Sequence, residues 1–248
     1  MLLTEGQVLD RRTLSPEATR FVESACEEMR RLGSMVESFL TLSRVNNGRA
    51  VQPSAVCPVN ELVMESASHC AGMANQHRVV LQPLLTELDI KVLGDLTLLR
   101  TMIDNLIRNA IRFSPAGEYV KIVVAVVDQP EVPLGVRPDG WPAQTTPPRA
   151  GPTAGPAPTL ASMQISVRDF GPGIPTSILP RIFDRFVQAA EEQRLGRGHG
   201  LGLEIAQGVA ELHGGTIAAR NVEPKGCEFT ITLPIFTDPE AREHNSLN

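Results

Sequence analysis

Prolines are concentrated in one part of this chain and divide the rest of it into two blocks. Nine of the twenty prolines lie between residues 128 and 160, together with four glycines. Each proline removes a backbone donor, so no helix or strand passes through such a stretch. We therefore expect residues 128–160 to form a disordered surface loop between two strands, with a proline-rich docking site as the alternative.

The composition is that of a globular protein with a core. Of the 248 residues, 42% are hydrophobic and 21% are charged, and the net charge of −5 gives no reason to expect a nucleic-acid partner. No apolar run approaches the roughly 20 residues that cross a bilayer, and the first ten residues lack the features of a signal peptide. The four cysteines form no CxxC pair, so we expect reduced thiols in a cytoplasmic protein.

The block before the prolines opens with a long amphipathic helix, predicted at about 16–46. Residues 15–17, Ser-Pro-Glu, combine an N-cap hydroxyl, a proline at the first helical position and an acid in the first turn. Apolar side chains then recur every three or four residues over 21–39. This stripe requires a partner, either another helix of the chain or a second subunit.

Strands and helices alternate along the rest of the chain. Helices are expected after an Asn60 cap, over 96–113 after an Asp95 cap, over 176–183 and over 201–212. Strands are expected at 79–81, 90–93, 119–127, 163–168, 216–221 and 228–233. Because several connections are hairpins, the pattern favours an α+β fold, with a mixed sheet and helices on one face.

A polar stripe marks the helix at 96–113. Asn105, Asn109 and Arg112 are spaced so that they share one helical face. An amide oxygen there suits Mg²⁺, which prefers oxygen ligands and takes several of them from phosphates, and the arginine suits a phosphate. A solvated helix face is the alternative.

Residues 169–174, Asp-Phe-Gly-Pro-Gly-Ile, place an acid at the end of a strand before two glycines. Glycines let the backbone approach a flat ligand closely. The Asp169 carboxylate can accept from the exocyclic amine of adenine, whereas the carbonyl of guanine would repel it. A simple turn with an aspartate cap is the alternative.

Residues 196–203, Gly-Arg-Gly-His-Gly-Leu-Gly-Leu, directly precede a helix. Such glycines free backbone amides to face phosphate oxygens, and the helix N-terminus adds its dipole. No Gly-Lys-Ser/Thr follows and no strand immediately precedes, so this is neither a Walker loop nor a dinucleotide fingerprint. A flexible loop is the alternative.

A further segment, Arg-Ile-Phe-Asp-Arg-Phe at 181–186, lies between the second and third of these motifs. In this order, the four segments resemble the N, G1, F and G2 boxes of sensor histidine kinases, which belong to the GHKL ATPases. The resemblance implies a two-layer α/β sandwich that holds ATP between the N-box helix and a mobile lid at 187–195. It implies a partial dimerisation hairpin at 1–50, an ATP-binding domain at 51–236 and a flexible tail at 237–248.

The resemblance also implies roles for individual residues. Asn109 would ligate Mg²⁺ with Asn105 beside it, and Asp169 would read adenine. The other ATP-binding residues that it implies are Arg112, Phe113, Gly171, Gly173, Ile174, Phe183, Phe186, Gly198, His199, Gly200, Leu201, Gly202 and Leu203. GHKL hydrolases carry a glutamate base at the position of Asn105, and an amide cannot serve as one. We therefore expect transfer of the γ-phosphoryl group to a histidine on a dimerisation domain, for relay to a response regulator.

Three departures from the family limit these expectations. The His-acid-x-x-x-Pro box that accepts the phosphoryl group is absent, since no histidine precedes His69. Gln188 stands where many relatives have an arginine, and Cys227-Glu228 where a Ser/Thr pair is common. We expect this chain to bind Mg·ATP without phosphorylating itself, and the full-length protein, cytoplasmic or the cytoplasmic part of a membrane sensor, to form a homodimer through helix 16–46. The alternatives are an ATP-binding regulatory or pseudokinase module that acts through heterodimers, and an anti-sigma-type serine kinase.

Overall fold

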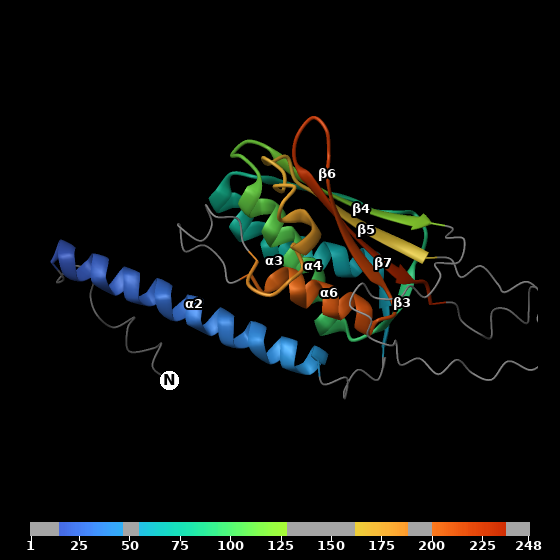
Figure 1. Cartoon of the computed structure of the whole chain (residues 1–248), viewed down its shortest axis with the longest axis horizontal. Helices are drawn as coiled ribbons and strands as arrows, with labels where there is room; N and C mark the ends of the chain where they lie inside the picture. Colours follow the sequence, from blue (N-terminus) through green and yellow to red (C-terminus); the bar gives the residue numbers. More distant parts are fainter. Residues whose placement is uncertain (1–14, 47–54, 128–161, 188–199, 237–248) are drawn as a thin grey trace, which may run out of the picture.

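Figure 1 shows the chain as a computed structural model, which describes residues 15–46, 55–127, 162–187 and 200–236. A sheet forms one layer, helices α3, α4 and α6 form the other, and the long helix α2 runs beneath α6. The helical elements are α2 (Pro16–Asn46), α3 (Val59–His77), α4 (Leu96–Phe113), the 3₁₀ turn η1 (Leu179–Arg181) and α6 (Gly202–Leu212). The strands are β1 (Ala55–Pro58), β2 (Val80–Leu84), β3 (Lys91–Gly94), β4 (Tyr119–Val127), β5 (Ser162–Arg168), β6 (Thr216–Asn221) and β7 (Cys227–Pro234).

The main sheet is mixed and has five strands in the order β2-β4-β5-β7-β6. Strands β2 and β4 pair in parallel, and the other pairs are antiparallel. Buried and half-buried residues alternate along β5 and β7, so one sheet face meets the helices and the other stays open. The predicted α+β sandwich is thus confirmed. Strands β1 and β3 form a separate two-stranded sheet that the sequence did not predict.

Helix α4 owes its position to its apolar stripe. Eight apolar side chains of this helix are buried, at 98, 99, 102, 103, 106, 107, 110 and 111. Asp95 caps the helix as predicted, because its Oδ1 accepts from the backbone N–H of Thr97 at 2.8 Å and of Leu98 at 3.0 Å. Such a cap contributes about 1 kcal/mol. Burial of this stripe leaves the polar stripe of the same helix outside the core.

His213 joins the end of α6 to the start of α4. Its Nε2 accepts from the backbone N–H of Asp95 at 3.1 Å, so Nδ1 carries the proton and donates to the carbonyl of Val209 at 2.7 Å. The residue does stand in the turn that ends the helix, as expected, and it also connects two segments 118 residues apart.

Two local predictions are wrong. Asn60 does not cap α3, whose N-cap is Pro58, and its Nδ2 donates instead to the carbonyl of Thr86 at 2.8 Å. The helix expected at 176–183 is only the 3₁₀ turn η1, which contains Pro180. The ring of a proline is compatible with a first helical turn and disrupts a longer helix.

Helix α2 has the predicted bounds and packs on α6 near its own C-terminal end. Leu42 is buried there, and a Cβ added to Gly208 would lie 2.5 Å from Cγ1 of Val45. Further toward the N-terminus the apolar stripe is exposed, with Phe21 76% and Phe39 69% accessible. Among the residues that the structure describes, the stripe thus finds a partner only at one end.

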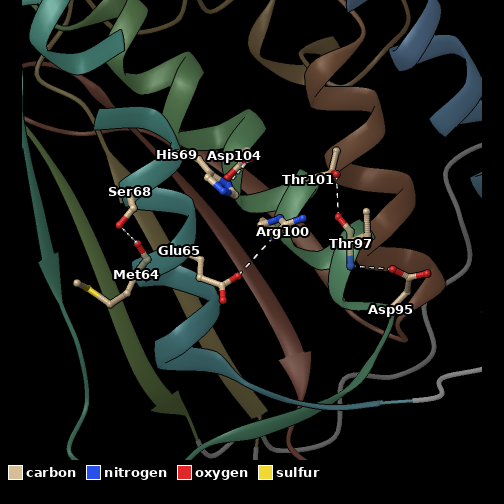
Figure 2. A network of polar contacts seen from close by, with 9 residues as sticks. All are labelled: Met64, Glu65, Ser68, His69, Asp95, Thr97, Arg100, Thr101 and Asp104. Carbon is tan, nitrogen blue, oxygen red and sulfur yellow. Dashed lines mark hydrogen bonds and ion pairs between the residues drawn. The ribbon is translucent and has the colours of Figure 1, made fainter. Parts of the chain in front are cut away.

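Ion pairs line the outer surface of α3 and α4 (Figure 2). His69 Nδ1 lies 3.8 Å from the Asp104 carboxylate, and Arg100 lies 3.5 Å from the Glu65 carboxylate. The Glu65 carboxylate is exposed, so its pair with Arg100 contributes little to stability, about 0–1 kcal/mol. The His69 side chain is 50% exposed, whereas that of Asp104 is mostly buried. His69 is therefore a surface helix residue, as the sequence suggested.

The proline-rich stretch at 128–160 lies outside the described residues. The strands that it joins are neighbours, since Val127 of β4 pairs with Ser162 of β5. All four cysteines are free thiols, as expected. Among the described residues, no helix is both long enough and apolar enough to span a membrane.

Candidate nucleotide-binding site

The Asp169 carboxylate is the most constrained polar group of the site. It follows β5 directly and is 1% exposed. Its Oδ1 accepts from the backbone N–H of Gly171 at 2.9 Å and of Cys227 at 3.2 Å, and its Oδ2 accepts from Sγ of Cys227 at 2.8 Å. A carboxylate oxygen can accept more than one hydrogen bond. Oδ2 therefore keeps capacity for one further donor.

Cys227 holds its proton in this setting. Burial and the neighbouring Asp169 carboxylate raise the pKa of the thiol far above its ordinary range. The thiol is therefore protonated at neutral pH and acts as a donor. The sequence marked Cys227 only as a departure from a Ser/Thr pair, and did not predict its contact with Asp169.

The loop after Asp169 touches the end of helix α4. A Cβ added to Gly171 would lie 2.5 Å from the carbonyl oxygen of Phe113. Only glycine fits such an approach. The first and second sequence motifs therefore meet in space, with the half-buried Asn109 and Arg112 on the helix that ends there.

Asn221 fixes the far side of the same loop. Its Oδ1 accepts from the backbone N–H of Ile174 at 2.7 Å, and its Nδ2 donates to the carbonyl of Ile174 at 2.8 Å. Gly173 has φ of +81°, which a larger residue rarely adopts. Gly173 and Ile174 are thus in the loop as predicted. Asn221 was missed, because it lies on β6, 47 residues along the chain.

The start of α6 lies against α4. A Cβ added to Gly202 would lie 3.2 Å from Oδ1 of Asn105, so the third motif meets the first. No side chain of the described residues caps this helix, whose N-cap is the buried Leu201. Within the described part of the chain, the buried Nδ2 of Asn105 has no hydrogen-bond partner. Uncapped amides and an unpaired amide group are the features of an anion site.

The two phenylalanines of the segment at 181–186 differ in how they are held. The Phe183 ring packs edge-to-face on Phe229 of the core, with centroids 6.3 Å apart. Phe186 exposes 60% of its surface, and its backbone N–H donates to the carbonyl of Gly200 at 3.1 Å. Phe183 thus packs in the core through its ring, whereas Phe186 is held through its backbone.

An ion pair that the sequence did not predict lies beside this contact. Nε of Arg185 donates to the carboxylate of Glu204, which is in the first turn of α6. The other carboxylate oxygen of Glu204 is buried and has no hydrogen-bond partner among the residues described. This ion pair and the Phe186–Gly200 hydrogen bond therefore connect the segment before residues 188–199 to the segment after them. Leu203 is half-buried on α6, whereas Gly198, His199, Gln188 and all of the predicted lid except Val187 lie outside the described residues.

The sequence matches a known family over most of its second half. The family described as histidine kinase-, DNA gyrase B-, and HSP90-like ATPase matches residues 94–237. The sensor histidine kinase TrcS of Mycobacterium tuberculosis is 30% identical over 222 residues, which are 89% of this chain and 38% of TrcS. The sensor histidine kinase CusS of Escherichia coli is 26% identical over 235 residues, 94% of this chain and 42% of CusS. The chain thus spans about two fifths of the length of these relatives.

Solved structures share the fold. ShkA, solved at full length in complex with AMPPNP, gives a TM-score of 0.64 at 24% identity and covers 91% of this chain and 40% of its own. The histidine kinase AdeS of Acinetobacter baumannii gives 0.61 at 22% identity over 90% of this chain and 88% of its own. These structures show the fold alone. The family match covers more than half of the sequence, and the chain therefore belongs to the histidine kinase-, DNA gyrase B- and HSP90-like ATPases, with the ATPase catalytic domain found in sensor histidine kinases.

Proposed function

We propose that this chain binds Mg·ATP and transfers the γ-phosphoryl group to a histidine on a dimerisation domain, for relay to a response regulator. One observation carries the proposal: a buried carboxylate, Asp169, is held by three donors at the point where the Gly171 loop meets the end of α4. The remaining capacity of Oδ2 suits the exocyclic amine of adenine. The carbonyl of guanine would meet the same oxygen as a second acceptor and be rejected.

The triphosphate would lie at the other end of the site. The start of α6 offers backbone N–H groups and a positive dipole end. Asn105, which contacts Gly202, adds a buried amide donor. Transfer then depends mainly on positioning of the phosphates and neutralisation of their charge, because phosphoryl transfer needs little covalent chemistry from the protein.

Asn109 is the proposed protein ligand of Mg²⁺. Its amide oxygen is a neutral hard donor on the same half-buried stripe as Asn105, and such a donor suits Mg²⁺. In the described ranges no three His, Cys, Asp or Glu side chains gather to hold a metal by themselves. This agrees with an ion that takes most of its ligands from phosphates and water. When bound, the ion would neutralise the charge on the phosphates.

The site lacks a base for hydrolysis at the position where related hydrolases have one. Asn105 stands there, and an amide cannot take a proton from water. The proposed acceptor is a histidine on a separate helical hairpin. The exposed stripe of α2, which includes Phe21 and Phe39, supports association with a second copy of this helix in the full-length protein.

Two measurements test the proposal. Titration calorimetry with ATP, with and without Mg²⁺, should show binding that Asp169→Asn abolishes and that Asn109→Ala makes insensitive to Mg²⁺. Label from γ-labelled ATP should appear, as an acid-labile phosphoramidate, on a purified dimerisation hairpin supplied in trans, and not on this chain alone. Absence of ATP binding would overturn the proposal. Binding without transfer to any hairpin would favour the regulatory module instead.

A further inference from the structure

Phe170 directly follows Asp169, and the two side chains lie on opposite faces of the sheet. Successive residues of an extended strand point to opposite faces of a sheet. Asp169 extends the β5–β7 ladder, since its N–H donates to the carbonyl of Cys227 at 3.0 Å, and its side chain is buried on the helix side. Phe170 is half-buried on the open face. The neighbour of the proposed adenine-reading residue is therefore an aromatic ring on the other side of the sheet.

Two side chains hold this ring. The Tyr119 ring, from the first residue of β4, lies with its centroid 4.4 Å from that of Phe170 at an interplanar angle of 50°. Cζ of Arg168 lies 4.7 Å from the centroid of the Phe170 ring. The first contact joins the start of β4 to the segment after β5, and the second joins that segment to the last residue of β5. Tilted aromatic pairs and a guanidinium over a ring face are both attractive arrangements.

The backbone at Asp169 and Phe170 lies close against Gly226 of the β6–β7 hairpin. A Cβ added to Gly226 would overlap the carbonyl of Asp169 and lie 3.0 Å from Cα of Phe170. Tyr119 and Arg168, which contact the Phe170 ring, are called the clamp below. Nη2 of Arg168 donates to the carbonyl of Glu223 at 3.4 Å, and this bond joins Arg168 to the hairpin that carries Gly226. The segment at 169–171 is thus enclosed by the β6–β7 hairpin, the end of α4 and the Phe170 ring contacts.

We propose that Phe170, held by Tyr119 and Arg168, is a positioning residue for Asp169. The hydrogen bond from Gly171 to Oδ1 exists only if the backbone between the two residues keeps its path. The ring on the open face fixes that path, and so fixes where Oδ2 stands relative to the base. The inference rests on the proposed function, because it assigns Phe170 to base selection in that site.

The test compares affinities for ATP and for ITP, which carries a carbonyl where adenine has its amine. In Phe170→Ala the affinity for ATP should fall about tenfold, as expected when a positioned group is misplaced. The ratio of the affinity for ATP to the affinity for ITP should fall as well. Phe170→Tyr should restore both. Val123→Ala is the matched control, because Val123 lies on the same open face of β4 and lines up with Ser166 rather than with the loop. It should leave the ratio unchanged.

The opposite results overturn the inference. If Phe170→Ala weakens ATP and ITP equally and the ratio stays at the wild-type value, Phe170 has only a general structural role. If Phe170→Ala does not fold, Tyr119→Leu removes only the Tyr119 contact with the Phe170 ring. An unchanged ratio of ATP affinity to ITP affinity in Tyr119→Leu would likewise show that the clamp has only a general structural role. Failure of the wild-type chain to bind ATP, or an unaltered affinity in Asp169→Asn, would overturn the proposed function and the inference with it.

Discussion

Cys227 donates its thiol proton to Asp169, with Sγ 2.8 Å from Oδ2, while the backbone N–H of the same cysteine serves Oδ1. One residue thus orients both oxygens of the carboxylate. Cys227→Ala should lower the affinity for ATP roughly fivefold, since the loss of a weak thiol donor to the carboxylate costs about 1 kcal/mol. Cys227→Ser keeps a donor and should bind ATP at least as well as the wild type. Calorimetric titration of the three proteins checks this order, and equal affinities would contradict a role for the thiol.

The same thiol makes stability dependent on alkaline pH. Burial, and then the Asp169 carboxylate, raise the pKa of Cys227 far above its ordinary range, so the folded protein keeps a proton that the unfolded chain loses above about pH 8.5. The unfolded state then binds fewer protons, and the free energy of unfolding should fall by up to about 1.4 kcal/mol per pH unit. Urea titrations between pH 7 and 10 should show a shallower fall in Cys227→Ser. Cys26→Ser, on the surface helix α2, should follow the wild type.

At Gly208, helix α6 leaves room for the Val45 side chain of α2. Gly208→Leu should displace Val45, because even a Cβ would stand 2.5 Å from its Cγ1, and overpacking costs about 1–3 kcal/mol. Limited proteolysis should then cut α2 faster. Gly72→Ala on α3 is the control, since nothing lies within 4 Å of its added Cβ. That variant should gain up to about 1 kcal/mol from helix propensity. Equal protection of α2 in wild type and Gly208→Leu would disprove the contact.

Arg185 and Glu204 should contribute more than an ordinary surface pair. The Glu204 side chain is only 15% exposed, so Arg185→Ala leaves a mostly buried carboxylate without its partner. We expect a loss of about 1–2 kcal/mol of unfolding free energy. Arg181→Ala breaks the pair with Asp184, whose side chain is 53% exposed, and should change stability by less than about 0.5 kcal/mol. Denaturant titration of both variants decides whether the ranking holds.

The sequence predicted what depends on local pattern. The strands at 119–127 and 163–168, the helix at 96–113 and its Asp95 cap all follow from neighbours within a few residues. It failed where a distant group decides, as when Thr86 takes the Asn60 side chain that looked like a cap. The contact of Asn221 with Ile174 is of the same kind. No local spacing reveals such a contact, because only the closed sheet brings its partners together.

In the candidate site, too, the sequence predicted local motifs and missed contacts between distant residues. Asn105, Asp169 and Gly202 were predicted as members of three separate motifs, and the structure brings these motifs together around α4. The Arg185–Glu204 pair was missed, because its residues lie 19 positions apart and Glu204 belongs to none of the motifs.

The pairing of Val127 with Ser162 has an entropic consequence. Because the two strand ends already stand side by side, the 34 residues between them have no distance to bridge, and a turn of four residues would close the same hairpin. For a flexible chain the closure cost grows only with the logarithm of the number of residues, so joining these ends through 34 residues instead of four would cost about 2 kcal/mol more. Each further doubling of the number of residues would add only about 0.6 kcal/mol, so the length of this connection can change at a small cost to the fold.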